Sequence, residues 1–191
     1  MSLASDKHRV LFIHTHRTGG TSVRKALMAA DPATRTIGFG HMTIDEVAAL
    51  DDPARHYWTF AAVREPRSWL LSLFQYVRWS LAGHHDHQLV HGMAFDEFVH
   101  WLVEVGLKRD GTYRRQSEFV RGVASVYPYE AMGTAIPTLF HSVGFPDVNL
   151  GHELKSPRVT YYWSHDFSRY VEQHFAEDRW HHQRAMETWG K

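Results

Sequence analysis

The chain has 191 residues, and its 21 lysine and arginine side chains are balanced by 21 aspartate and glutamate side chains. This length predicts one domain covering residues 1–191, and 43% hydrophobic residues exclude a disordered chain. A net charge of zero gives no basis for a nucleic-acid partner, and the absence of cysteine excludes disulfides. We see neither a membrane span nor a secretory signal, so we expect a cytoplasmic protein without a membrane partner.

The first predicted elements are a strand, a loop with two glycines and a helix. Residues 9–14 (RVLFIH) form a short apolar run bounded by polar residues, which predicts a buried strand. Apolar residues then repeat at helical spacing, which predicts a helix over residues 22–30. The apolar face of this helix consists of Val23, Ala26, Leu27 and Ala30.

A second strand-and-helix series follows. Residues 36–40 are expected to form a short strand, and Thr43 with Glu46 has the pattern of a capping box, which predicts a helix to Leu50. Residues 57–63 (YWTFAAV) predict another buried strand, after which Pro66 is expected to begin a helix that reaches about Leu81.

The remaining elements are less regular in pattern. We expect a loop rich in histidine and glycine at 83–94, a basic irregular segment at 106–116, and helices at 96–105, 117–124 and 167–175. Short strands and loops are expected between 125 and 160. Strands that alternate with helices predict an α/β fold with a central parallel sheet flanked by helices on both faces.

The loop between the first strand and the first helix has the composition of an anion-binding site. Gly19 and Gly20 allow the backbone to approach a ligand closely, and the first amides of the following helix point toward it. Taken alone, the loop fits an ordinary glycine-rich turn equally well. The Walker pattern would require lysine where Thr21 stands, and this lysine neutralises the β- and γ-phosphates, so a kinase is disfavoured.

Residues 12–22 (FIHTHRTGGTS) resemble the F-I-H-I-P-K-T-G-G-T-S loop of sulfotransferases that use 3′-phosphoadenosine 5′-phosphosulfate (PAPS). In that family the loop holds the 5′-phosphosulfate. The resemblance implies a single-domain, three-layer P-loop-like α/β fold. It also implies that the 5′ end is bound by Arg17, Thr18, Gly19, Gly20, Thr21 and Ser22.

A second motif agrees with the first. Residues 63–66 (VREP), with Ser72 eight residues after Arg64, are similar to the family's V-R-D-P-x-x-R-x-x-S segment, in which the arginine and serine hold the 3′-phosphate. The resemblance therefore assigns Arg64 and Ser72 to that phosphate, and we expect two separated anion pockets. The alternatives are a surface ion pair for Arg64 and mid-helix packing for Ser72.

Three departures of the chain from the family pattern bear on the chemistry. Arg17 stands where the family has lysine, and arginine keeps the charge but cannot donate a proton at ordinary pH. We therefore give Arg17 a catalytic role in stabilising the leaving phosphate by its charge. His16 replaces a proline, and Trp69 occupies the place of a second arginine.

The candidate base is His41. Gly40 and His41 resemble the segment that supplies the catalytic histidine in glycan 2-O-sulfotransferases, and imidazole suits removal of a hydroxyl proton. The alternative is a histidine that packs before the helix cap at Thr43. His14 and Glu65 are the other candidate bases.

Two further segments carry ionisable side chains. Residues 110–116 are faintly similar to a D-x-H-W-x-P-Q stretch near the cofactor, and this region either covers an anionic cofactor or is a solvated loop. The basic residues within this stretch and just before it are Lys108, Arg109, Arg114 and Arg115. The histidines of the 83–94 loop include no helical pair of the HExxH type, so we expect no metal.

These expectations combine into one function. The resemblance implies transfer of a sulfuryl group from PAPS to a hydroxyl of a carbohydrate or small-molecule acceptor, with release of 3′-phosphoadenosine 5′-phosphate (PAP). A nucleotide-binding protein that has lost the chemistry is the second hypothesis, and a small-molecule kinase is the third.

Overall fold

The computed structural model describes residues 1–51, 53–79, 83–109, 111–146, 150 and 160–190. Its strands form one five-stranded open sheet with the order β3-β1-β2-β4-β5. The strands are β1 (Ser2–Ser5), β2 (Val10–Ile13), β3 (Arg35–Ile37), β4 (Trp58–Val63) and β5 (Ser125–Pro128). The α/β class is confirmed, and the strands expected at 9–14, 36–40 and 57–63 correspond to β2, β3 and β4.

The sheet is mixed, which corrects the expectation of a parallel sheet. β2 and β4, and β4 and β5, pair in parallel, whereas β1 pairs antiparallel with both β2 and β3. Four strands therefore run in one direction and β1 opposes them. Sequence analysis did not predict β1 because Leu3 is the one large apolar side chain among its four residues. Ser2 and Ser5 are buried within the sheet although they are polar.

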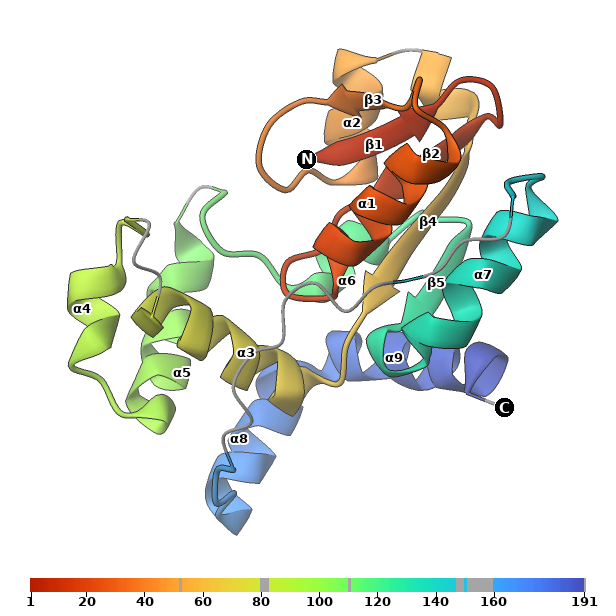
Figure 1. Cartoon of the computed structure of the whole chain (residues 1–191). Helices are drawn as coiled ribbons and strands as arrows, with labels where there is room; N and C mark the ends of the chain where they lie inside the picture. Colours follow the sequence, from red (N-terminus) through yellow and green to blue (C-terminus); the bar gives the residue numbers. More distant parts are fainter. Residues whose placement is uncertain (52, 80–82, 110, 147–149, 151–159, 191) are drawn as a thin grey trace.

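Helices make up most of the remaining chain (Figure 1). The α-helices are α1 (Gly20–Ala30), α2 (Ile44–Leu50), α3 (Pro66–Trp79), α4 (His87–His91), α5 (Phe95–Glu104), α6 (Gln116–Val120), α7 (Met132–Ser142), α8 (His165–His174) and α9 (Ala176–Trp189). Short 3-10 turns occupy Pro53–His56, Gly106–Lys108 and Tyr129–Ala131.

Most of the predicted helices are present, but three were missed. The capping box before α2 is confirmed, since the Glu46 amide donates to Thr43 Oγ1 at 3.3 Å and the Thr43 amide donates to Glu46 Oε2 at 2.8 Å. Leu81, the expected end of α3, lies outside the described residues. The 83–94 segment is not wholly a loop, because it contains α4. Sequence analysis did not predict α7 because Pro137 lies within it. It did not predict α9 because the buried face of this helix holds just Asp178 and Ala185, which give no apolar repeat.

Helices pack against both faces of the sheet. Val10 and Phe12 of β2 face a core that includes residues of α1 and α7, while the alternate residues Leu11 and Ile13 face a core with α2, α6 and α9. A third apolar cluster joins α3, α4, α5 and α8 beyond one end of the sheet (Figure 1).

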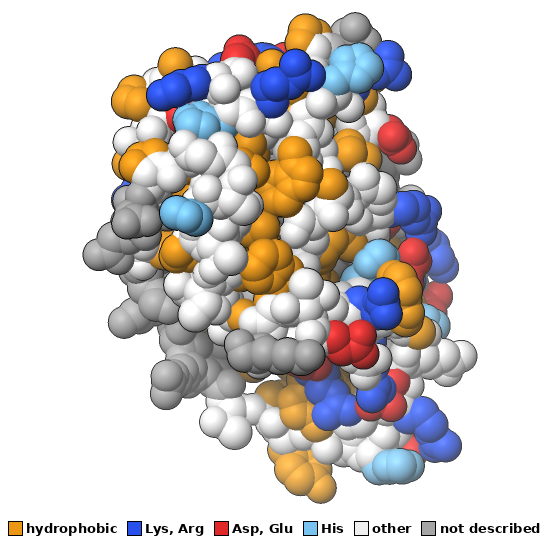
Figure 2. Space-filling model, turned by 90° about the vertical axis from the view of Figure 1, so that its right-hand side faces the viewer, with side chains coloured by type: hydrophobic (Ala, Val, Ile, Leu, Met, Phe, Trp, Pro, Cys, Tyr) orange, Lys and Arg blue, Asp and Glu red, His pale blue; other side chains and the backbone are white. Residues whose placement is uncertain are grey.

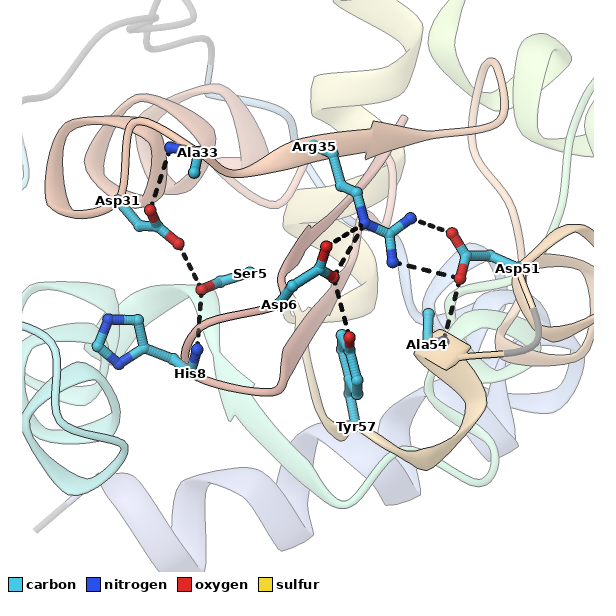
Figure 3. A network of polar contacts seen from close by, with 9 residues as sticks. All are labelled: Ser5, Asp6, His8, Asp31, Ala33, Arg35, Asp51, Ala54 and Tyr57. Atoms are coloured by element: carbon cyan, nitrogen blue, oxygen red, sulfur yellow. Dashed lines mark hydrogen bonds and ion pairs between the residues drawn. The ribbon is translucent and has the colours of Figure 1, made fainter.

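A polar network fixes β1 at the end of the sheet remote from the glycine loop (Figure 3). Arg35, the first residue of β3, donates from Nε to the Asp6 carboxylate at 2.9 Å and also pairs with Asp51 at the end of α2. The Tyr57 hydroxyl donates to Asp6 at 2.9 Å. These bonds tie the turn after β1 to β3, α2 and the residue before β4, and they hold the register of the antiparallel strand.

The face that carries α7 in Figure 1 has hydrophobic side chains in its middle and charged side chains mainly toward its margins (Figure 2). α7 buries Ala135, Ile136 and Leu139 against the sheet. In the part of the chain that the structure describes, no helix combines the length and the apolar composition needed to cross a bilayer.

Candidate anion-binding site

A cavity of about 510 Å³ lies at the carboxyl ends of the four co-directional strands. β2 leads into the glycine loop, β3 leads to His41, β4 leads to Arg64, and β5 leads to Tyr129; all four segments line the cavity. Because the carboxyl ends of co-directional strands meet at one edge of a sheet, loops that are far apart in sequence converge there. This edge is the usual ligand site of α/β sheets.

The cavity brings together most of the residues proposed for binding and catalysis. Those that line it are Arg17, Gly19, Gly20, Thr21, Ser22, His41, Arg64 and Ser72. The exception is Thr18, which is fully buried, and its hydroxyl donates to the Thr15 carbonyl at 2.9 Å. The Thr18 side chain therefore supports the loop from within.

Glycine is required at both positions of the loop, for different reasons. Gly19 precedes α1 with a φ of 77°, a conformation that favours glycine, and a Cβ there would lie 2.7 Å from Met132 Sδ. Gly20 is the first residue of α1, and a Cβ there would lie 1.9 Å from Nε2 of His14. The imidazole of His14 thus packs directly against the start of the helix.

The two predicted motifs meet in the cavity. Arg64 Nη1 donates to the Arg17 carbonyl at 3.3 Å, and Arg17 Nε donates to Ser72 Oγ at 3.2 Å. Each guanidinium also lies over a tyrosine ring, at 4.7 Å for Arg17 on Tyr76 and 4.5 Å for Arg64 on Tyr129. The expected two separated pockets are therefore one continuous cavity, in which Arg17 reaches the serine assigned to the opposite end of the ligand.

The charged side chains of the described cavity wall are all arginines. Burial lowers the pKa of both Arg17 and Arg64, which reflects the cost of holding cations away from water. No aspartate or glutamate belongs to the cavity wall formed by the described residues. An anionic ligand would supply the counter-charge, so the arrangement fits phosphate or sulfate groups.

Three histidines form a cluster beside the glycine loop. The His41 ring centroid lies 4.4 Å from that of His14 and 4.0 Å from that of His16. His41 Nδ1 is 2.7 Å from the His14 carbonyl, which can only accept, so Nδ1 carries the proton and Nε2 has the free lone pair. In this tautomer, Nε2 is the nitrogen of His41 that can accept a proton.

The protonation of this cluster follows from its surroundings. Burial lowers the pKa of His41 to about 4 and lowers those of His14 and His16 well below 6.5, with a further lowering from neighbouring positive groups. The three rings are neutral at pH 7. A bound anion would raise these pKa values because it favours the imidazolium form.

Trp69 lines the cavity, whereas Glu65 does not. Trp69 is almost fully buried and donates from Nε1 to the His16 carbonyl at 3.0 Å, so it holds the loop in place. Glu65 does not line the cavity; its carboxylate accepts from the amides of Arg67 and Ser68 at the start of α3. Of the two other candidate bases, His14 therefore lines the cavity and Glu65 lies outside it.

The basic segment divides between the cavity and the surface. Arg114 lines the cavity and pairs with both oxygens of Glu46, at 2.6 and 2.7 Å, which lowers the pKa of Glu46 to about 2. Lys108 pairs with Glu104, and Arg115 donates to the His174 carbonyl outside the cavity wall. Asp110 lies outside the described residues.

A set of polar residues that the sequence did not reveal holds Arg64. The Arg64 amide donates to Gln116 Oε1 at 2.8 Å, and Gln116 Nε2 donates to the Arg64 carbonyl at 2.9 Å. Gln116 begins α6, and the buried carboxylate of Asp178 accepts from the amides of Gln116 and Ser117 at 3.1 and 2.9 Å. No local pattern links residues 64, 116 and 178, so sequence reasoning had no signal for this arrangement.

The histidine-rich segment offers a possible set of cation ligands. The ligand atoms of His84, His85 and Asp86 lie within 4.8 Å of one another, and both histidines line the cavity. The Asp86 oxygens already bind Arg109 at 2.7 Å and the Tyr113 hydroxyl at 3.0 Å, so a metal would have to displace these partners. The geometry favours a structural role for Asp86.

No protein-family model, curated protein or solved structure matches this chain.

Proposed function

We propose that the protein is a sulfotransferase with a P-loop-like three-layer fold, which moves a sulfuryl group from PAPS to a hydroxyl of a carbohydrate or small-molecule acceptor and releases PAP. One observation carries the proposal: two separate sequence motifs converge in a single cavity that also contains a histidine. The contacts Arg64 Nη1 to the Arg17 carbonyl and Arg17 Nε to Ser72 Oγ join the two motifs.

The residues of the cavity suit the parts of PAPS. The amides at the start of α1 and the side chains of Arg17 and Ser22 would hold the 5′-phosphosulfate. Arg64 and Ser72 would hold the 3′-phosphate. The aromatic rings of Tyr76 and Tyr129 line the same cavity and provide apolar wall beside the two guanidiniums.

His41 would accept the proton of the acceptor hydroxyl. Its Nε2 lone pair is available because Nδ1 donates to the His14 carbonyl. As the acceptor oxygen bonds to sulfur, the bond from sulfur to the phosphate oxygen breaks, and the positive charge of Arg17 stabilises the leaving phosphate. No metal is needed for this transfer.

A nucleotide-binding protein without catalysis is the second candidate. The pKa of about 4 for His41 favours it, because a base works best when its pKa is near the operating pH. A kinase is less well supported. The described cavity wall lacks a carboxylate to hold Mg²⁺, and Thr21 occupies the Walker lysine position.

Ligand-dependent thermal stability separates the three candidates. A ligand present at one hundred times its Kd should add about 2.7 kcal/mol to the unfolding free energy. We expect PAP to stabilise the protein more than adenosine 5′-phosphate or ATP with Mg²⁺. Transfer of labelled sulfate from PAPS to a panel of hydroxyl acceptors then separates an enzyme from a binding protein. Preferential stabilisation by ATP with Mg²⁺ would overturn the proposal.

A further inference from the structure

The proposed transfer needs a proton donor for the leaving phosphate, and Arg17 cannot supply this proton. The leaving phosphate oxygen gains negative charge as the bond to sulfur breaks, and a proton donor there would lower the barrier. An arginine side chain stabilises charge but cannot donate its proton at ordinary pH. A second group with a titratable proton near the start of α1 would complete the site.

His14 occupies that place. Its Nε2 lies so close to Gly20 that a Cβ on this residue would be 1.9 Å away, so the ring is packed against the first turn of α1. The ring lines the cavity and lies 4.4 Å from the His41 ring, centroid to centroid. His14 is only partly buried, so part of its ring faces the cavity.

We propose that His14 takes up a proton from solvent when the phosphate-bearing ligand enters the cavity, and that His14 donates this proton to the leaving 5′-phosphate oxygen. This inference rests on the proposed function and adds a second catalytic histidine to it.

The electrostatic surroundings of His14 explain why the proton arrives with the ligand. The titratable and charged groups that act on it are His41 from the segment after β3, Arg24 from α1 and the Met1 ammonium beside β1; His16 belongs to the same loop. All of these are neutral or positive, so together with burial they lower the pKa of His14 in the empty protein. A phosphate group reverses the balance and favours the imidazolium.

The step balances. The acceptor hydroxyl loses its proton to His41 Nε2 as the acceptor oxygen bonds to sulfur. The bond from sulfur to the 5′-phosphate oxygen breaks, its electron pair stays on that oxygen, and this oxygen takes the proton of His14. His14 ends neutral and His41 ends protonated, and exchange with solvent restores both.

Calorimetric titration with PAP tests the inference directly. Binding enthalpies measured at pH 7.5 in buffers with different ionisation enthalpies give the number of protons taken up. We expect up to about one proton more per PAP in the wild-type protein than in His14→Gln. His87→Gln is the matched control, because His87 bonds to the Val77 carbonyl and does not line the cavity; its proton uptake should equal that of the wild type.

The results distinguish a failure of the proposed function from a failure of the role of His14. Failure of the wild-type protein to bind PAP would overturn both. If PAP binds without proton uptake, the role of His14 alone is overturned. The same holds if His14→Gln retains the uptake and His41→Gln loses it. If His14→Gln does not fold, the smaller His14→Asn replaces it. In basal hydrolysis of labelled PAPS, His14→Gln should also lose the alkaline limb of the pH–rate profile.

Discussion

Replacement of Arg64 by alanine should weaken PAP binding strongly while the fold persists. The Arg64 side chain lines the cavity, and among the described residues it makes one hydrogen bond, of 3.3 Å, to the Arg17 carbonyl. A hydrogen bond to a charged group contributes about 1.5–3 kcal/mol, which corresponds to a roughly 10- to 150-fold rise in the Kd for PAP.

The fold should tolerate this change because the backbone of Arg64, not its side chain, is what Gln116 holds. Loss of the bond to Arg17 and of the contact with the Tyr129 ring costs about 1–2 kcal/mol, and removal of a buried cation offsets part of this cost. The melting temperature should therefore fall by a few degrees at most in a domain of this size.

Isothermal titration with PAP, accompanied by thermal unfolding, measures both effects. Arg64→Lys should recover part of the affinity, because lysine keeps the charge without the planar fork of donors. Arg67→Ala is the matched control from the same strand-to-helix junction, since Arg67 pairs with Glu172 and does not line the cavity. An unchanged Kd in Arg64→Ala, with Arg67→Ala behaving identically, would refute the assignment of the 3′-phosphate.

Further changes test other parts of the site. His41→Gln should keep the wild-type Kd for PAP but lose 10²-fold or more in sulfate transfer, as measured with labelled PAPS; retained turnover would place the base elsewhere. Gly20→Ala should lower both the PAP affinity and the unfolding free energy because its Cβ would collide with His14, whereas Gly133→Ala, with open space around it, should be neutral or stabilising in the same assays. Acidification should destabilise the protein: His41 has a pKa of about 4 when folded against an ordinary 6.5, so the unfolded chain binds more protons between these values. Urea unfolding should show stability that His41 raises by up to about 1.4 kcal/mol per pH unit from pH 4 to 6.5, with a further rise from His14 and His16, and a flat profile in that range would contradict the burial of the cluster. Asp178→Asn should destabilise the protein by about 1–3 kcal/mol in urea unfolding because asparagine has one acceptor oxygen for two amides, and wild-type stability would show that this contact has little effect.

The parts of the fold that sequence predicted are those with a strong local pattern. The apolar runs of β2 and β4 and the capping box at Thr43 are local signals, and each leads to an element that the structure contains. β1 was missed because three of its four residues, Ser2, Ala4 and Ser5, are small, and the strand is defined by its pairing with strands on both sides. Its antiparallel direction follows from that pairing and not from any property of its own residues.

Sequence likewise predicted some features of the candidate site and missed others. Arg17, Arg64 and His41 each follow a predicted strand, and because β2, β4 and β3 run in the same direction, these residues lie at one edge of the sheet. Sequence could not show that Arg17 contacts Ser72, because this depends on the direction of a long side chain. Nor could it show that Gln116 and Asp178 hold the segment of Arg64, since these contacts join residues more than fifty positions apart.

A crystal structure of the PAP complex tests the central claim most directly. The account predicts that the 5′-phosphate lies at the amides of Gly20 and Thr21 and that the 3′-phosphate lies within hydrogen-bond distance of Arg64 and Ser72. A complex in which PAP binds outside this cavity, or in which the Arg64 guanidinium contacts neither phosphate, would contradict it.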